Sequence, residues 1–132
     1  MIMRIATLEI EGKIYPLVFS LNAAEKIEDE CIQIDDMMDC FLNPKKYSKN
    51  GVRIIKDILF IMLCEGIRYC QRKEIEEYQN KKLELGIPDK DDLFQDLSYE
   101  DFGTLIEAVY NTLITSKKKE STIKLAKEVK DQ

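Results

Sequence analysis

The sequence predicts a predominantly helical α+β fold, in which an N-terminal β-hairpin packs on a helical bundle with a long central helix. Three observations support this fold class: two short runs of alternating apolar residues flank Glu11-Gly12, a wide apolar run covers residues 51–70, and an amphipathic pattern covers residues 98–116. Alternation indicates strands, whereas apolar residues three or four apart indicate helices. We expect one domain over residues 1–116, followed by a basic tail over residues 117–132.

Composition restricts the classes of function. The chain of 132 residues is 45% hydrophobic and 34% charged, with a net charge of −5 and no histidine. An acidic balance argues against a general nucleic-acid-binding protein, which would be basic. The lack of histidine removes the commonest general base and metal ligand, which argues against an enzyme without excluding one. The N-terminus has no signal-peptide pattern, and we therefore expect a cytoplasmic protein.

The four cysteines do not form a recognisable metal site. They show no C-x-x-C spacing and are Cys31, Cys40, Cys64 and Cys70. Structural zinc sites use closely spaced pairs, and disulfides are rare in a reducing cytoplasm. We therefore expect small, buried or half-buried apolar side chains, with no metal and no cofactor.

The N-terminal strands are predicted over residues 2–10 and 13–19. Gly12 can adopt the positive φ of a tight hairpin turn. Pro16 cannot donate a ladder hydrogen bond, so the second strand should lie at an edge or contain a bulge. Both faces of this strand are partly apolar, with one face formed by Tyr15, Leu17 and Phe19 and the other by Ile14 and Val18.

Two shorter helices should follow the hairpin. The first begins with Ser20 or Asn22 as its N-cap and is predicted to bury Leu21, Ala24, Ile27 and Cys31. The second covers residues 35–42, because the residue before Pro44 disfavours the helical region. Residues 43–51 have the composition of a loop.

The central helix is predicted over residues 51–70. Its apolar face is wide enough to need neighbours on more than one side. Charged residues interrupt it, so the apolar stretch is far shorter than the ~20 residues of a membrane span. We expect the helix to continue through the charged segment 72–84, with Gly86-Ile-Pro88 as its end.

The last core helix has the clearest start in the chain. After an acidic connector that begins at Asp89, Ser98 is the expected N-cap, with Asp101 as its capping-box partner and Leu97 packed on Phe102. The helix should reach about Ser116, and the tail beyond it is either a frayed helical extension or a segment that orders on a partner. Its apolar stripe would form core or a partner-binding surface, and the candidate residues are Tyr99, Phe102, Ile106, Val109, Tyr110 and Leu113.

Two carboxylate patterns in the sequence have the spacing of possible magnesium sites. Asp35-Asp36-Met-Met-Asp39 matches a D-D-x-x-D spacing, but an acidic helix N-terminus stabilised by the helix dipole explains it better. The pairs Glu25/Glu28 and Glu74/Glu77 would suit a small magnesium-dependent nucleotide pyrophosphohydrolase if they lay on two facing helices. This enzyme is kept as an alternative function.

The layout of the chain resembles the tail assembly chaperones of long-tailed bacteriophages and prophages. The matching segments are the strand–Glu11-Gly12-Lys13–strand unit, Tyr15–Ser20, Leu21–Glu28, Ile58–Gly66 and Leu97–Tyr110. Together they cover most of residues 5–115. The helix predicted beyond residue 71 is longer than the family pattern.

The resemblance implies a chaperone without a catalytic site. It would bind the tape-measure protein before the tube polymerises. The tail-tube protein is a second candidate client. The chaperone would act in the bacterial host cytoplasm, form a homo-oligomer when no client is bound, and be absent from the mature virion. In many such phages a ribosomal frameshift yields a longer product, and the codons of Lys117–Lys119 are a candidate slippery site. A helical adaptor or regulator of a mobile element is a further alternative.

Overall fold

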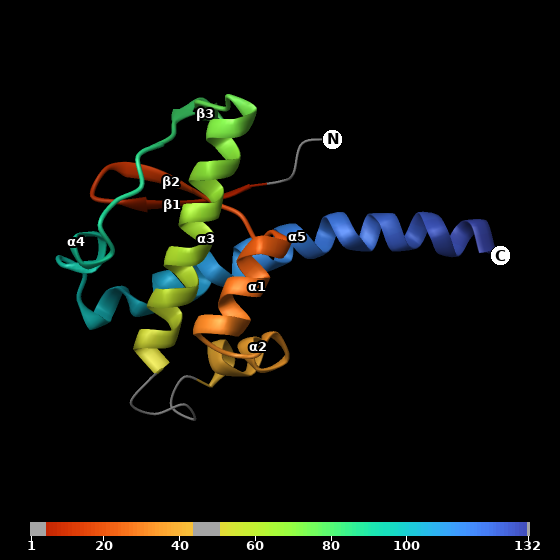
Figure 1. The fold of residues 1–132 in the computed structure, drawn as a ribbon, viewed down its shortest axis with the longest axis horizontal. Coiled ribbons are helices and arrows are strands. Elements are labelled where there is room, and N and C mark those ends of the chain that lie inside the picture. The colour runs from red at the N-terminus through yellow and green to blue at the C-terminus, as the bar shows by residue number, and fades with distance from the viewer. Residues whose placement is uncertain (1–4, 44–50, 132) are drawn as a thin grey trace.

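The computed structural model describes residues 5–43 and 51–131, with the backbone alone described at 38, 40–42 and 117–131. It confirms the predicted fold class, since a small N-terminal hairpin packs on a long central helix within a mainly helical chain (Figure 1). The elements in order are β1 (Ala6–Ile10), β2 (Lys13–Leu17), α1 (Leu21–Glu30), α2 (Ile34–Leu42), α3 (Gly51–Lys73), β3 (Glu77–Tyr78), β4 (Lys81–Lys82), α4 (Lys90–Phe94), the 3-10 helix η2 (Tyr99–Asp101) and α5 (Phe102–Asp131).

The N-terminal hairpin forms as predicted. β1 and β2 pair in antiparallel register from Ala6 opposite Leu17 to Ile10 opposite Lys13. The two turn residues both have positive φ, 51° at Glu11 and 80° at Gly12. This is the geometry of a type I′ turn, whose twist matches that of the two strands.

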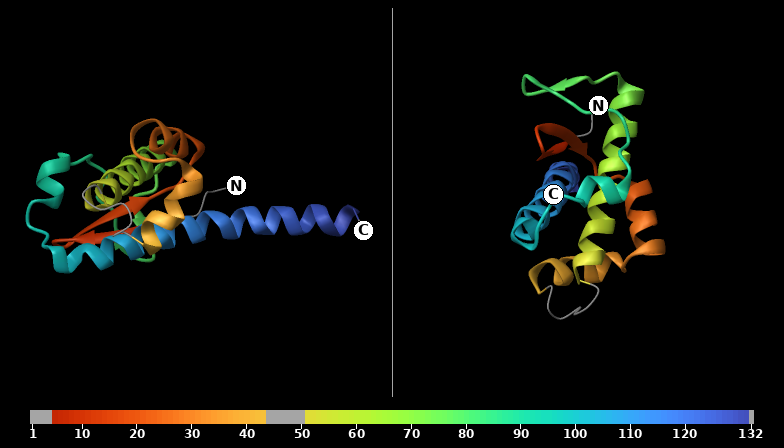
Figure 2. Two further views of the ribbon diagram at one scale, coloured as in Figure 1. Left: turned by 90° about the horizontal axis from the view of Figure 1, so that it is seen from below. Right: turned by 90° about the vertical axis from the view of Figure 1, so that its left-hand side faces the viewer.

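The hairpin lies between α3 and α5, with β2 packed against α3 and β1 against α5 (Figure 2). A lone hairpin is marginal in water, and here one face is buried, whereas Thr7 and Glu9 on the other face remain exposed. One face contributes Leu8, Ile10, Tyr15 and Leu17 to the main core, and the other contributes Ile5 and Val18 to a smaller apolar cluster.

Pro16 lies on the outward edge of β2, as expected. The neighbouring outward groups are paired with other segments: the Val18 N–H donates to the Met62 carbonyl at 3.1 Å, and the Glu84 N–H donates to the Ile14 carbonyl at 2.7 Å. The missing N–H of Pro16 therefore removes no bond from the β1–β2 ladder.

Helix α1 begins one residue after Ser20, whose hydroxyl accepts a hydrogen bond from the Ala23 N–H at 3.1 Å. Asn22 is therefore not the cap. The predicted burial of Leu21 is wrong, since this side chain is 90% exposed, whereas Ala23 and Ile27 are fully buried. Residues four apart share a helix face, and the start at Ser20 turns Ala23 and Ile27 toward α3. Ala24 and Cys31 are half-buried.

Helix α2 extends from Ile34 to Leu42, within one residue of the predicted segment 35–42. Asp35 and Asp36 lie in its first turn, where negative charge is favourable. Of the predicted loop over residues 43–51, residues 44–50 lie outside the described part of the chain, and Gly51 already belongs to α3.

The central helix α3 is buried along most of its length, as its wide apolar face predicted. It ends at Lys73, and the predicted continuation through residues 72–84 is wrong. Glu74 has a left-handed φ of 58°, the Glu74 N–H donates to the Gln71 carbonyl and the Ile75 N–H donates to the Cys70 carbonyl. These two bonds form a Schellman C-cap, which usually has glycine at the left-handed position.

A second small hairpin replaces the predicted helical extension. β3 and β4 pair through Glu77–Lys82 and Tyr78–Lys81, and the turn residues Gln79 and Asn80 have positive φ. This segment covers the outer face of the first hairpin and the end of α3. It does so with Leu83, which is buried, and with the partly buried side chains of Ile75, Tyr78 and Leu85.

The predicted start of the last core helix is confirmed, although η2 forms its first turn. The Asp101 carboxylate accepts a hydrogen bond from the Ser98 N–H at 2.9 Å. The acidic connector contains the short helix α4, whose cap Asp89 accepts from the Asp92 N–H at 3.1 Å. Helix α5 continues past the predicted end at Ser116 to Asp131 and projects beyond the other elements (Figure 1).

Candidate partner-binding site

The six predicted partner-binding residues separate into two groups. Phe102, Val109 and Leu113 are buried in the core of this chain, and Ile106 is partly buried against it. These four therefore pack within the chain and do not offer a free surface. Tyr110 is 38% exposed and Tyr99 is 75% exposed. Only the two tyrosines lie largely at the surface.

Tyr99 lies at a surface groove of about 220 Å³. Two segments that are distant in sequence form its walls: the first turns of α3, and the continuous run from the end of α4 to the start of α5. The lining side chains are Val52, Lys56, Phe94, Leu97, Ser98, Tyr99, Phe102 and Leu105. The apolar stripe of the sequence thus reaches the surface at one end, through Tyr99.

Local contacts fix the positions of the aromatic side chains that line the groove. The rings of Tyr99 and Phe102 stack with centroids 5.6 Å apart. The Ser98–Asp101 hydrogen bond fixes the turn that carries Tyr99. Lys56 Nζ lies 5.4 Å from the centroid of the Phe94 ring, within the range of a cation–π interaction. Tyr99 is therefore held outward by its backbone turn while Phe102 beneath it is buried.

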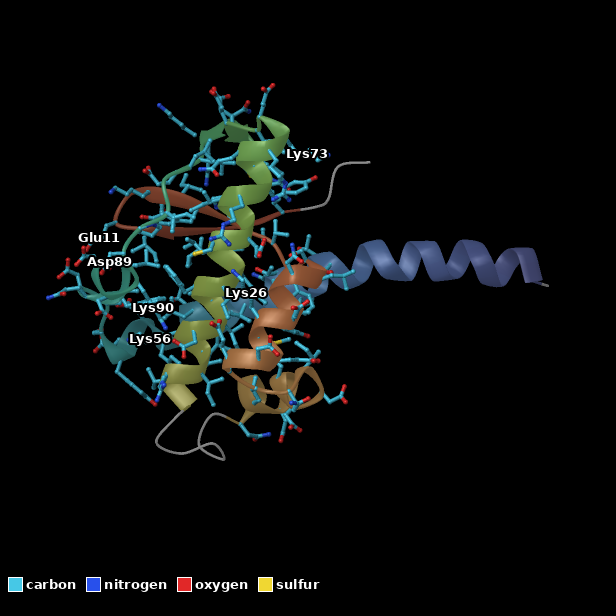
Figure 3. All side chains as sticks on the ribbon, viewed as in Figure 1. Glu11, Lys26, Lys56, Lys73, Asp89 and Lys90 are labelled. Carbon is cyan, nitrogen blue, oxygen red and sulfur yellow. The ribbon has the colours of Figure 1, made fainter. Side chains whose placement is uncertain are left out.

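An ion pair joins the two helices that form the opposite walls. Lys90 at the start of α4 pairs with Asp57 of α3, and Arg53 Nε lies 3.9 Å from the same carboxylate. Lys56, Asp89 and Lys90 lie on the side of the molecule that carries α4 (Figure 3). This pair fixes α4 on α3, and so positions Phe94 beside Lys56.

The groove is lined mainly by apolar side chains, with the charged Lys56 among them, and one of its walls is built from an acidic stretch of the chain. From Asp89 to Asp101 the chain carries one lysine and six acidic residues: Asp89, Asp91, Asp92, Asp96, Glu100 and Asp101. Most of these carboxylates are exposed. A ligand with apolar side chains and positive charge would match both properties.

A second hollow lies on the α1 side of the Asp57–Lys90 pair. It has a volume of about 360 Å³ and is lined by Glu30, Cys31, Asp57, Phe60, Ile61 and Lys90. Burial, and then the Asp57 and Glu30 carboxylates, raise the pKa of the Cys31 thiol to about 11. Cys31 is therefore protonated near neutral pH and is a poor nucleophile or metal ligand there.

The cysteines behave as the sequence predicted wherever their side chains are described. Cys64 and Cys70 are buried, Cys31 is half-buried, and all three are free thiols. Burial raises the pKa values of Cys64 and Cys70 as well. The side chain of Cys40 lies outside the described part of the chain.

The carboxylate pairs of the alternative enzyme do not meet on facing helices. Glu25 and Glu28 lie on α1, but Glu74 follows the end of α3 and Glu77 belongs to β3. All four side chains are exposed. Among the side chains that the structure describes, which include Asp35, Asp36 and Asp39, no group of three or more Cys, Asp or Glu is arranged to hold a metal ion.

Sequence reasoning found Tyr99 and Phe102 but missed the rest of the groove. Val52 and Lys56 were assigned only to the central helix, and Phe94 to a connector. No local pattern connects these residues, because they are about 40 positions apart and are brought together by the packing of α4 and α5 on α3. The exposure of Val52 is visible only in the structure, so the sequence carries no signal for this wall of the groove.

Comparisons with protein-family models, with curated proteins and with solved structures gave no match. Among the helices that the structure describes, none has the length and apolar character needed to cross a membrane.

Proposed function

We propose that this chain is a tail assembly chaperone of a long-tailed bacteriophage or prophage. It binds the tape-measure protein, and in a wider role the tail-tube protein, in the bacterial host cytoplasm before the tube polymerises. It is not retained in the mature virion. The proposal rests on the sequence resemblance and on one structural observation, the apolar groove beside the exposed Tyr99.

The groove suits protein side chains better than a small substrate. Pockets for small molecules usually measure about 300–1,000 Å³, so a groove of about 220 Å³ is below that range. It is large enough for one or two apolar side chains of a helix, which is a common mode of peptide recognition. Tape-measure chains are long and helical, and they present many such side chains.

The properties of the rim favour a reversible interaction. A chaperone must release its client when the tube assembles, so a small contact area is an advantage. The acidic carboxylates around the groove keep an exposed apolar surface in solution when no client is bound. The groove also favours a binding function over the pyrophosphohydrolase, because the carboxylates of the latter are dispersed over α1, β3 and the end of α3.

Co-expression with the tape-measure protein tests this function. The chain should increase the fraction of tape-measure protein that stays in the supernatant and should co-purify with it. Tyr99→Ser should reduce both, because the hydroxymethyl group cannot fill the space of the ring. Tyr110→Ser is the matched control, since Tyr110 is an exposed tyrosine of α5 that does not line the groove. Thermal unfolding of each variant verifies that the fold is intact.

The possible results separate the function from the site. A tape-measure protein that remains equally insoluble with and without the chain would refute the chaperone function. If both tyrosine variants retain full activity, the chaperone function stands and the groove is not the client site. A gene for a tail-tube protein before this gene, and one for a very long helical protein after it, would give independent support.

A further inference from the structure

We propose that the groove of one copy binds the C-terminal segment of a second copy, residues 117–131. The two copies then associate head to tail, and the segment covers the surface assigned above to the client. This inference concerns the same groove as the proposed function, but it depends only on this chain and is tested without a client.

Charge complementarity identifies the occupant. The segment carries three acidic residues and six lysines, which are Lys117, Lys118, Lys119, Lys124, Lys127 and Lys130. Part of the groove wall, from Phe94 to Tyr99, belongs to the acidic stretch from Asp89 to Asp101. Since the whole chain has a net charge of −5, the part before this basic segment is more negative than the whole. Opposite charges on the two surfaces increase the rate of association and select the orientation of binding.

The segment also supplies the apolar groups that the groove needs. Its sequence contains Ile123, Leu125 and Val129 among polar residues, and its backbone is helical to Asp131. A helix with a few apolar side chains is the usual ligand of a short hydrophobic groove. The volume of about 220 Å³ matches one or two such side chains.

The geometry of α5 assigns the segment to another copy. The groove uses residues at the start of α5, including Phe102 and Leu105, whereas the segment forms the far end of the same helix. At 1.5 Å per residue, Leu105 and Leu125 are separated by roughly 30 Å along the axis. Figure 1 and the left view of Figure 2 show α5 as one straight helix whose C-terminal end points away from the body. The segment therefore cannot reach the groove of its own chain.

This contact joins two different surfaces, so it is heterologous. Such contacts close into rings, extend into open assemblies, or occur twice in a reciprocal pair. Each arrangement hides the groove from solvent when no client is present. A client with higher affinity for the groove would displace the segment and break the assembly. Because ion pairs contribute, the association should weaken as salt is raised.

Sedimentation of full-length variants tests the pairing of the two surfaces. The groove variant carries Tyr99→Ser and Val52→Ser, two exposed positions that should not affect folding. The segment variant carries Lys124→Gln, Leu125→Ser and Lys127→Gln. We expect the wild type to associate in 50 mM salt, and each variant to associate about tenfold more weakly. The control variant Leu21→Ser with Tyr110→Ser, which alters exposed residues outside the groove, should associate like the wild type.

Mixing the two variants gives the decisive result. The groove variant keeps an intact segment and the segment variant keeps an intact groove, so an equimolar mixture should form a complex of two chains. A wild type that sediments as a monomer at about 100 μM would overturn the proposal. So would a groove variant that associates as well as the wild type, which is the result expected if segments pair with each other, or a mixture that stays monomeric.

Carbodiimide cross-linking of a mixture of ¹⁴N- and ¹⁵N-labelled wild type gives a measurement that needs no variant. Cross-links between copies should connect lysines of residues 117–130 with carboxylates of residues 89–101. Cross-links that instead connect those lysines mainly with Glu25 and Glu28 on α1 would refute the groove as the binding surface. Because no client is present in these experiments, their failure leaves the chaperone function standing. Failure of the co-expression experiment would likewise leave the self-association intact.

Discussion

The main chain of Pro16 in β2 lies directly against Gly66 in α3, with no side chain between the helix and the strand. A Cβ atom added at Gly66 would come closer than 3.0 Å to the Pro16 carbonyl group and to the Leu17 amide nitrogen. The Val18 N–H also donates to the Met62 carbonyl one helical turn away. The central helix and the hairpin are thus joined through their backbones, and Gly66 is the residue that permits this approach.

Replacement of Gly66 by alanine should destabilise the chain. The new methyl group meets backbone atoms, which cannot rotate away, so we expect the free energy of unfolding to fall by about 1–3 kcal/mol. Gly103→Ala is the matched control, because a Cβ at this exposed helical position meets nothing within 4 Å. It should be neutral or stabilising by up to about 1 kcal/mol. Urea unfolding of both variants measures the difference, and equal stabilities would contradict the close packing.

Truncation of an exposed and of a buried side chain of α1 should change the free energy of unfolding by very different amounts. Leu21 is 90% exposed, so Leu21→Ser should change the free energy of unfolding by less than about 0.5 kcal/mol. Ile27 is fully buried against α3, and Ile27→Ala should cost about 2–5 kcal/mol through lost burial and a cavity. Chemical denaturation measures both values. A large cost at Leu21 would indicate that the helix begins in the register predicted from sequence.

The Asp57–Lys90 pair should contribute modestly to stability and more clearly to the position of α4. The Asp57 and Lys90 side chains are 20% and 41% exposed, so solvent screens their interaction. A double-mutant cycle with Asp57→Ala and Lys90→Ala should give a coupling energy of about 0.2–1 kcal/mol, which decreases in high salt. Arg53→Ala is the control, since Arg53 contacts Asp57 from an 80% exposed position. A coupling energy of zero in low salt would show that α4 is held by apolar contacts alone.

Alkylation of Cys31 should be slow near neutral pH. A pKa of about 11, compared with the ordinary value of 9.0, means that the folded chain retains the thiol proton more tightly than the unfolded chain. At pH 8 the thiolate fraction, and hence the iodoacetamide rate, should be about a hundredfold lower in the folded protein than in urea. Peptide mapping by mass spectrometry follows Cys31 alone. Comparable rates in the two states would disprove the raised pKa.

The same pKa shift sets the direction of a pH effect on stability. The proton is held in the folded state up to about pH 11 but is lost from the unfolded state near pH 9.0. The contribution of Cys31 is therefore complete below pH 9 and disappears as the pH rises toward 11. Cys31→Ala should remove this part of the alkaline loss of stability, as measured by urea unfolding between pH 8 and 10.

Local hydrogen bonds explain why several boundaries were predictable. The turn at Glu11-Gly12 and the cap at Ser20 are formed by groups three residues apart or fewer, so their signals are contiguous in the sequence. The Ser98–Asp101 bond has the same local character. The end of α3 escaped prediction because Glu74, rather than a glycine, takes the left-handed position of its C-cap. A residue with that side chain gives no sequence signal for such a conformation.

The candidate site was predicted only in part, for a reason that also lies in the packing. The apolar residues from Tyr99 to Leu113 indicated one apolar helix face. Their spacing would be the same whether that face packs in the core of this chain or binds a partner. The structure buries Phe102, Val109 and Leu113 against the core and leaves Tyr99 at the surface, in the 3-10 turn η2 that precedes α5.

The sequence by itself determined the hairpin, the starts of the helices and the apolar periodicity, since each depends on residues within a few positions of one another. Only the tertiary structure decided that residues 75–85 would cover the first hairpin, and that Val52, Phe94 and Tyr99 would form one groove. These arrangements are set by burial between distant segments. Free energy of this kind depends on which surfaces meet, and a single helical or strand period does not specify that choice.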